Sequence, residues 1–221
     1  MLHQHVVICV DRAGLVGEDG ETHHGIFDVG FLRQAPGLML LAPGSCLELQ
    51  EMLYWAVAEQ NGPVAIRYPR GGDRDYKDSA WAAGLQGNHN VHCHREGDAL
   101  TLIAYGTMLQ NVMDVAKLLE EKGIEAKVLR LLQLNPLPVR EIIQAINPQA
   151  PVYIREEVSG NCGLKESIAW EIHKEFPDCV VDGLDLGHQY ITHGSIPELY
   201  EYYGLSSRKI AEYILERQHE G

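Results

Sequence analysis

A glycine-rich segment, residues 11–25, carries the side chains whose types and spacing could do chemistry. Arg12, Asp19, His23 and His24 lie there among glycines that allow tight turns and close approach to a ligand. A guanidinium can bind an anion, and an imidazole can donate a hydrogen bond to developing oxyanion charge. Because short glycine motifs are weak evidence alone, a solvated loop with incidental polar residues is an equal alternative.

Arg70 is a second candidate anion ligand. It lies in the run Arg67 to Gly72, directly after a predicted strand, and Arg12 also follows a predicted strand. Because the carboxyl ends of parallel strands lie at one edge of a sheet, Arg12 and Arg70 could form a bidentate cradle for a phosphate. The alternative is a surface ion pair between Arg70 and Asp73 or Asp75, a common fate for arginine in an acidic protein.

Short apolar strands are expected to position these side chains. Strands are predicted at residues 6–10, 38–42 and 64–68. A capping box of Ser45 and Glu48 marks the start of a helix that ends near Gly62. Three strands with one helix leave a parallel sheet with an open edge and little covering. We therefore expect residues 1–76 to be half of a domain whose beginning is missing.

A second unit, residues 94–221, is predicted beyond a charged, glycine-rich linker at 77–93. Its strands are expected at 100–105, 126–131, 152–154 and 180–181. Its helices are expected from Thr107 to about 122, after Pro138, at about 164–174 and from Ser195, with Thr107 and Gln110 as caps of the first. The alternation of strands and helices predicts an α/β fold with a largely parallel sheet.

Composition excludes several classes of function. The 221 residues include 45% hydrophobic and 22% charged side chains, with a formal net charge of −13. Such an acidic surface argues against nucleic acid or an anionic membrane as the main partner. No apolar run approaches the roughly 18 residues of a membrane span, and no signal peptide is evident at the start. The five cysteines are scattered without a C-x-x-C pair, so a cytoplasmic location is expected.

Three motifs connect the sequence to a known family. They are Asp11-Arg12-Ala13-Gly14, Gly17-x-Asp19-Gly20-x-Thr22-His23-x-Gly25-x-Phe27-Asp28 and Arg67-Tyr68-Pro69-Arg70-Gly71. In this order they resemble the 1-deoxy-D-xylulose-5-phosphate synthases, which are transketolase-like thiamine-diphosphate enzymes. Residues 102–106, 156–157 and 193–195 are similar to the family's C-terminal domain. The resemblance implies a partial pyrimidine-binding transketolase-like domain followed by a complete transketolase C-terminal α/β domain.

The resemblance also implies roles for individual residues. This family condenses pyruvate with glyceraldehyde 3-phosphate and releases carbon dioxide, using thiamine diphosphate and magnesium. Arg12 and Arg70 would hold the acceptor's phosphate, and fixing that remote group lowers the entropic cost of aligning the aldehyde. His23 matches a catalytic histidine near the reacting oxygens, and Asp19 matches an aspartate that binds a hydroxyl or orders the loop. His24 falls at a variable position of the motif, so we expect it to be structural.

Departures from the family pattern limit what this chain is expected to do alone. The family's magnesium and diphosphate motif and its catalytic glutamate find no counterpart in the sequence, and the glycine-rich turn at 159–165 is kept only in part. We therefore expect no cofactor bound to this chain and no turnover by it alone. The chain is expected to be an expressed fragment or a split or truncated gene product, and to form a homodimer or larger assembly.

Two alternative functions stay open. The first is another transketolase-like enzyme, either transketolase itself or the β-subunit of a 2-oxo-acid dehydrogenase, although the motifs around Arg12 and Arg70 favour the synthase. The second is a non-catalytic module that uses the C-terminal domain to dimerise.

Two further clusters have a weaker claim to function. The histidines and cysteine of residues 88–94 could bind zinc, but a strand would send His92 and His94 to one face and Cys93 to the other. The adjacent carboxylates of residues 156–157 could suggest acid–base chemistry. Neighbouring side chains of an extended backbone point apart, so a shared proton is not expected and a structural role is favoured.

Overall fold

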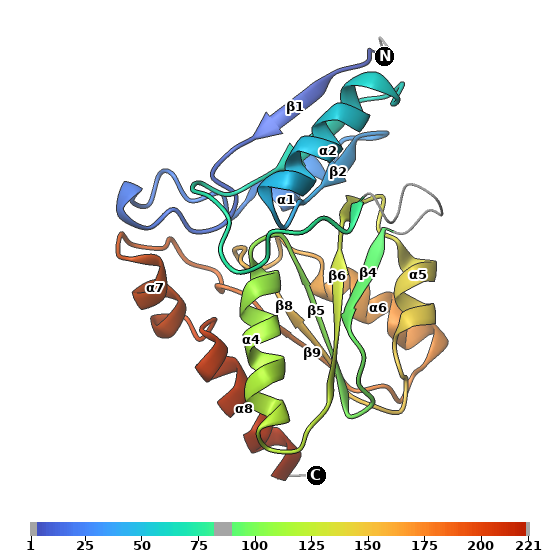
Figure 1. The fold of residues 1–221 in the computed structure, drawn as a ribbon, viewed down its shortest axis with the longest axis vertical. Helices are drawn as coiled ribbons and strands as arrows, with labels where there is room; N and C mark the ends of the chain where they lie inside the picture. Colours follow the sequence, from blue (N-terminus) through green and yellow to red (C-terminus); the bar gives the residue numbers. More distant parts are fainter. Residues whose placement is uncertain (1–3, 82–89, 220–221) are drawn as a thin grey trace.

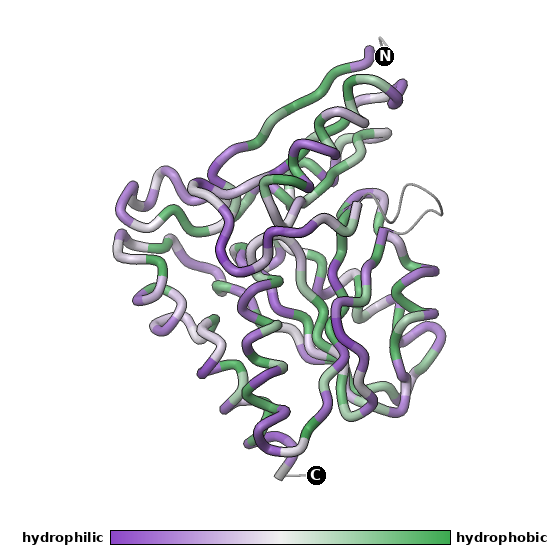
Figure 2. Tube along the Cα trace, viewed as in Figure 1, coloured by the Kyte–Doolittle hydropathy of each residue, from purple (hydrophilic) through white to green (hydrophobic). Residues whose placement is uncertain are grey.

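The computed structural model describes residues 4–81 and 90–219, which form two β-sheets. The N-terminal elements lie at one end of the larger sheet, whose faces are both flanked by helices (Figure 1). The outer helices change between hydrophilic and hydrophobic residues along their length, as amphipathic helices do (Figure 2). No helix among the described residues is long and apolar enough to span a membrane.

The smaller sheet has the strand order β1-β3-β2-β7. Its strands are β1 (Val7–Val10), β2 (Met39–Leu41), β3 (Val64–Arg67) and β7 (Gln133–Asn135). The first three are parallel and confirm the three predicted strands, whereas β7 comes from the second half of the chain and pairs antiparallel with β2. The expected boundaries at 76 and 94 remain a prediction, but one strand of the second unit belongs to the first sheet.

Two helices accompany the smaller sheet. A short helix that the sequence did not suggest, α1 (Asp28–Leu32), precedes β2, and α2 (Cys46–Ala58) connects β2 to β3. At the start of α2 the Ser45 hydroxyl accepts the Glu48 N–H at 3.1 Å, as predicted. The other predicted bond of the capping box, from Ser45 N to the Glu48 carboxylate, is not formed. The carboxylate instead accepts from Gly44 N at 2.7 Å and pairs with Arg130 at 2.5 Å.

The larger sheet has the strand order β4-β6-β5-β8-β9. Its strands are β4 (Val91–Arg95), β5 (Leu100–Tyr105), β6 (Ala126–Leu131), β8 (Val152–Arg155) and β9 (Val181–Leu184). All neighbours are parallel except the edge strand β4, which runs antiparallel to β6. This arrangement confirms the predicted α/β fold with a largely parallel sheet.

Helices cover both faces of the larger sheet (Figure 1). They are α4 (Met108–Glu120), α5 (Val139–Ala145), α6 (Lys165–Glu175), α7 (Ile196–Tyr202) and α8 (Ser207–His219). The helix opening at Ser195 is confirmed and carries a complete capping box with Glu198. The helix α8 was not predicted. Thr107 is the N-cap residue of α4, as predicted, but its side chain makes no cap, because the hydroxyl donates to Glu157 at 2.9 Å. Gln110 does not complete the cap either, since its side-chain oxygen accepts the Tyr76 N–H at 3.1 Å.

The apolar core joins the two sheets. One cluster packs Val29, Leu40 and Ala65 of the first unit against Ile103 and Leu129 of the second. All five side chains have almost no exposed surface, so the contact excludes water. The two sheets are therefore held in a fixed relation by hydrophobic burial as well as by the pairing of β2 with β7.

Candidate functional site

The loop of residues 11–25 begins at the end of β1 and is closed by backbone hydrogen bonds. Gly14 N donates to Gly25 O at 2.8 Å, and Gly25 N donates to Arg12 O at 3.0 Å. A Cβ on Gly25 would lie 2.2 Å from the Arg12 carbonyl oxygen, so this close approach requires glycine. Arg12 has a φ of 60°, a left-handed conformation that is uncommon outside glycine and is held here by its neighbours.

A buried ion pair supports the loop. The Nε of Arg67, the last residue of β3, donates to Asp28 at 2.8 Å, and its Nη2 donates to Gly25 O at 3.3 Å. Burial alone would lower the pKa of Arg67, but the neighbouring Asp28 carboxylate and Tyr105 raise it above its ordinary value. The charged guanidinium thus fixes both ends of residues 25–28. Arg67 and Asp28 both lie in the motifs of the sequence, but no local pattern indicated that they pair.

Arg12, Asp19 and Arg70 come together at the rim of the smaller sheet. One guanidinium nitrogen of Arg70 donates to Asp19 Oδ1, and the Nε of Arg12 lies 3.6 Å from Asp19 Oδ2. Arg12 also pairs with Asp11 at 2.5 Å. Because β1 and β3 are neighbours in the sheet, the residues that follow them meet at the same edge. The structure thus places a carboxylate between the two guanidinium groups.

The alternative partner proposed for Arg70 has another role. Asp73 accepts the backbone N–H of Cys46 at 2.6 Å, at the first residue of α2. A carboxylate there satisfies one of the free N–H groups of the helix start and complements its positive end. The alternative ion pair between Arg70 and Asp73 is therefore not formed, since Arg70 pairs with Asp19.

The two histidines of the loop differ in environment. His23 is exposed, and its Nδ1 lies 3.0 Å from the Thr22 hydroxyl. Its catalytic role stays a prediction. His24 is buried, accepts the Val16 N–H at Nδ1 (3.1 Å) and places Nε2 3.4 Å from Thr192 O. These contacts confirm the structural interpretation of His24.

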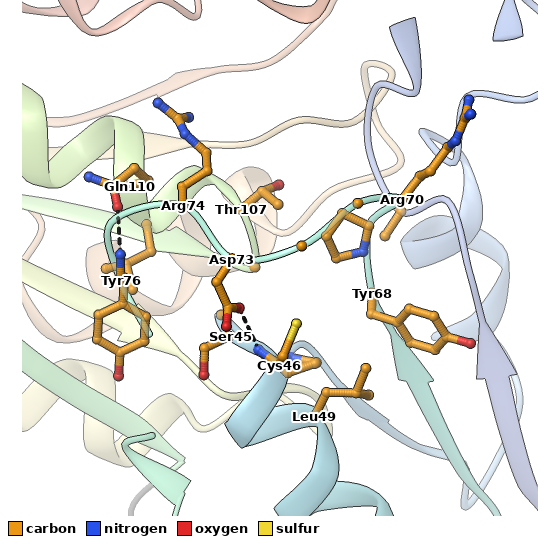
Figure 3. A pocket seen from close by; sticks show the side chains of 18 of the residues that line it. Ser45, Cys46, Leu49, Tyr68, Arg70, Asp73, Arg74, Tyr76, Thr107 and Gln110 are labelled. Atoms are coloured by element: carbon orange, nitrogen blue, oxygen red, sulfur yellow. Dashed lines mark hydrogen bonds between the residues drawn. The ribbon is translucent and has the colours of Figure 1, made fainter. Parts of the chain in front are cut away.

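A cavity of about 400 Å³ lies between the two units, directly beside Arg70. The starts of α2 and α4 reach it, through Ser45 and Thr107 respectively. In Figure 3, Arg70 and Arg74 extend to one side of the segment that follows β3, whereas Cys46 lies on the other. Arg74 donates to Asn111 Oδ1 at 3.2 Å, so Arg70 is the arginine of this segment that pairs with the 11–25 loop.

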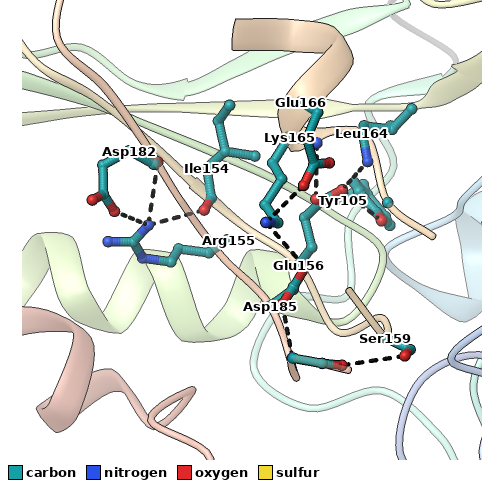
Figure 4. Close-up of polar contacts among 12 residues, drawn as sticks. Tyr105, Ile154, Arg155, Glu156, Ser159, Leu164, Lys165, Glu166, Asp182 and Asp185 are labelled. Carbon is teal, nitrogen blue, oxygen red and sulfur yellow. Dashed lines mark hydrogen bonds and ion pairs between the residues drawn. The ribbon is translucent and has the colours of Figure 1, made fainter. Parts of the chain in front are cut away.

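Glu156 and Glu157 follow β8 and point apart, as predicted. Glu156 accepts the Tyr105 hydroxyl at 2.9 Å and two backbone N–H groups at the start of α6, of Leu164 (2.6 Å) and Lys165 (2.9 Å) (Figure 4). Glu157 turns towards the 11–25 loop. Burial raises the pKa of both carboxyl groups, although their hydrogen bonds oppose that rise. The two carboxyl groups bind different partners and do not share a proton.

Among residues 4–81 and 90–219, no group of three or more histidine, cysteine or acidic side chains could hold a metal ion. His92 and His94 share one face of β4, with ring centroids 4.5 Å apart, while the Cys93 thiol lies 3.2 Å from Arg95 O. His89, the other histidine of the suggested cluster, lies outside the described residues.

Two family models match this chain. The family described as transketolase, C-terminal domain, matches residues 89–210, and the transketolase pyrimidine binding domain matches residues 1–73. The chain belongs to the transketolase family. Two solved structures share its fold over 96% of this chain: a split-gene transketolase titled an inactive β4 tetramer (24% identity, TM-score 0.70, 65% of that chain) and a Pichia stipitis transketolase variant (16%, 0.76, 30%).

Curated relatives narrow the comparison within that family. The 1-deoxy-D-xylulose-5-phosphate synthase of Chlorobaculum tepidum is 37% identical over 213 residues, and that of Chlorobium luteolum is 38% identical over 215. The synthase of Heliobacterium modesticaldum is 36% identical over 212 residues. In each case the match covers 96% of this chain. It covers 33% of the first two relatives and 32% of the third, so the chain spans about a third of their length.

Proposed function

We propose that this chain supplies the acceptor-phosphate site of a 1-deoxy-D-xylulose-5-phosphate synthase, which joins pyruvate to glyceraldehyde 3-phosphate with loss of carbon dioxide. The observation that carries the proposal is the pairing of Arg12 and Arg70 through Asp19. Two guanidinium groups that converge on one carboxylate can also converge on a phosphate, which carries more charge and more acceptor oxygens.

The residues of this chain act on the acceptor by binding and alignment. Arg12 and Arg70 hold the phosphate, which fixes the aldehyde at the other end of a short molecule and so reduces the entropy lost in the reaction. Asp19 then separates from the two arginines and accepts a hydrogen bond from a hydroxyl of glyceraldehyde 3-phosphate. Exposed and on the same loop, His23 donates a hydrogen bond to the oxygen where negative charge develops.

Thiamine diphosphate, bound with magnesium, supplies the carbanion chemistry of this family. We propose that residues matching the other two thirds of the relatives' length hold this cofactor, because the described residues offer no magnesium ligand cluster. The chain alone then binds no cofactor and makes no product. We also propose that the chain self-associates as a homodimer or larger assembly; the solved split-gene neighbour is titled an inactive β4 tetramer. We place it in the cytoplasm.

Complementation tests the proposed function. The chain would be combined with a polypeptide that carries the remaining part of a curated relative, with thiamine diphosphate and magnesium present. Pyruvate consumption that depends on glyceraldehyde 3-phosphate and on both polypeptides is the expected result. Turnover of a ketose phosphate donor in place of pyruvate would assign the chain to transketolase. Full assembly without turnover of either donor would favour the non-catalytic module.

A further inference from the structure

The loop that carries Arg12 and Asp19 is anchored largely on the second unit of the chain. Leu15 and Ile26 are buried in the core cluster that α4 and α8 form on the larger sheet. Ser159 N donates to Ile26 O at 2.9 Å. The loop therefore belongs to the first unit by sequence, while its packing depends on the C-terminal unit.

Glu157 makes the most direct connection between the loop and the second unit. One of its oxygens, Oε1, accepts the Leu15 N–H at 2.6 Å, and the other accepts the Thr107 hydroxyl at 2.9 Å. Burial, and after it the charge of Glu157, raises the pKa of the neighbouring Tyr200 hydroxyl well above its ordinary value. Glu157 is 5% exposed, so its hydrogen bonds are sheltered from water. Hydrogen bonds to a buried charged acceptor are shorter and stronger than those between neutral groups.

Gly14 is shaped to receive this carboxylate. A Cβ at Gly14 would lie 2.4 Å from Glu157 Oε2, and the φ of Gly14 is +78°, where other residues are strained. Gly14 and Leu15 come directly after Arg12 and Ala13. The Arg12 backbone is itself left-handed, a conformation that persists only when its surroundings hold it. The anchor thus lies within three residues of a phosphate-binding side chain.

We propose that Glu157 is a positioning residue for the acceptor-phosphate site. By holding the Leu15 N–H, it fixes the backbone that presents Arg12 opposite Arg70. Without it the Leu15 N–H loses its partner, the loop samples other conformations, and the two guanidinium groups meet less often. This inference rests on the proposed function, since it assigns a further residue to the same site.

Glu156 provides a matched control within the same strand end. It is as deeply buried as Glu157 and is likewise a carboxylate that accepts hydrogen bonds, from three donors. Its donors, Tyr105, Leu164 and Lys165, all belong to the second unit and none to the 11–25 loop. A general loss of stability should therefore follow from changing either glutamate, whereas a specific effect on the loop should follow from Glu157 alone.

The test compares Glu157→Ala, Glu157→Gln, Gly14→Ala and Glu156→Ala in the 221-residue chain. Hydrogen–deuterium exchange measures the protection of residues 12–25, and NMR titration measures the dissociation constant for glyceraldehyde 3-phosphate. We expect Glu157→Ala and Gly14→Ala to lower loop protection and to weaken binding about tenfold, or about 1.4 kcal/mol. Glu157→Gln keeps an acceptor for Leu15 and should restore part of both.

The complemented enzyme adds a readout that a purely structural role would leave unchanged. Glu157→Ala should raise the Michaelis constant for glyceraldehyde 3-phosphate and leave that for pyruvate unchanged. Equal effects of Glu156→Ala and Glu157→Ala on loop protection and binding would overturn the inference. If the wild-type chain binds no glyceraldehyde 3-phosphate, the proposed function is refuted instead. The hydrogen–deuterium exchange of residues 12–25 would then decide by itself whether Glu157 anchors the loop.

Discussion

Asp19 and Arg70, which are 51 residues apart in the sequence, are joined by a hydrogen bond between carboxylate and guanidinium. The other oxygen of Asp19 faces Arg12 at 3.6 Å. An internal carboxylate thus occupies the position that we assign to the acceptor's phosphate. Both arginines are partly exposed, so an incoming anion can reach them and compete with Asp19.

Replacing this internal anion should make the site a better phosphate binder. Asp19→Asn removes the competing charge and leaves both guanidinium groups free to pair with phosphate. We expect inorganic phosphate to bind the Asn variant about three- to tenfold more tightly than the wild-type chain at low salt, where exposed charges are little screened. NMR titration provides the measurement. Asp73→Asn changes the net charge equally without touching Arg70, and should have little effect; matching gains in both variants would contradict the prediction.

Arg70→Ala should damage acceptor binding in the complemented enzyme. Losing one charge-assisted pair costs about 1.5–3 kcal/mol, so the Michaelis constant for glyceraldehyde 3-phosphate should rise roughly 10- to 100-fold. The Michaelis constant for pyruvate should stay the same, because Arg70 is proposed to contact the phosphate of glyceraldehyde 3-phosphate and not pyruvate. Steady-state kinetics with each substrate varied in turn gives both values. Arg74→Ala, on the same segment, is the control, and an unchanged acceptor constant for Arg70→Ala would remove Arg70 from the site.

A buried ion pair between α2 and β6 should contribute strongly to stability. Glu48 and Arg130 are both completely buried, and their side chains join the two units. Arg130→Met leaves a buried carboxylate without its counter-charge, so we expect the free energy of unfolding to fall by about 3–5 kcal/mol in urea denaturation. Lys117→Met, which breaks an exposed pair with Asp114, should change it by less than about 1 kcal/mol. Similar losses in the two variants would show that the buried pair is unimportant.

His94 should make the protein less stable in acid. Burial, reinforced by the positive charge of Arg130 and by His92, lowers the pKa of His94 to about 3. In the unfolded chain this ring takes up a proton near pH 6.5. The unfolded state therefore binds more protons between these values, and stability is lost as the pH falls from about 6.5 towards 3, at no more than about 1.4 kcal/mol per pH unit.

The variant His94→Gln isolates this contribution. Its free energy of unfolding, measured in urea at pH 7, 6 and 5, should fall less steeply with acidification than that of the wild type. Parallel pH profiles for the two proteins would show that His94 is not held neutral in the folded state.

Strands that consist of a short apolar run could be predicted from the sequence, whereas elements held by distant contacts could not. Short apolar runs predicted β1, β3 and β5, and β3 and β5 are buried on both faces, as such runs indicate. The same burial expected for β1 was wrong, because β1 is an edge strand and Ile8 is 40% exposed. The strand β7 was not predicted, since residues 133–135 carry little apolar pattern and are held by pairing with β2. Glu48 and Arg130 are 82 residues apart in the sequence, so no local motif could predict that they pair.

The candidate site shows the same division. The meeting of Arg12 and Arg70 followed from the rule that parallel strands end at one edge, and β1 and β3 are indeed neighbours. The place of Asp19 between them depends on how the loop folds back, which Gly25 and Glu157 decide through contacts distant in sequence. The Thr107 hydroxyl was assigned to a helix cap for a similar reason, because its real partner, Glu157, is 50 residues away.

The most direct test of the account follows the arginine side chains themselves. Nε–Hε resonances of ¹⁵N-labelled chain would be recorded during titration with glyceraldehyde 3-phosphate, with Arg74 as an internal control. We predict that the signals of Arg12 and Arg70 shift together with a single dissociation constant, while that of Arg74 stays in place. If the signals of Arg12 and Arg70 do not move, or move no more than that of Arg74, the two guanidinium groups do not form the phosphate site.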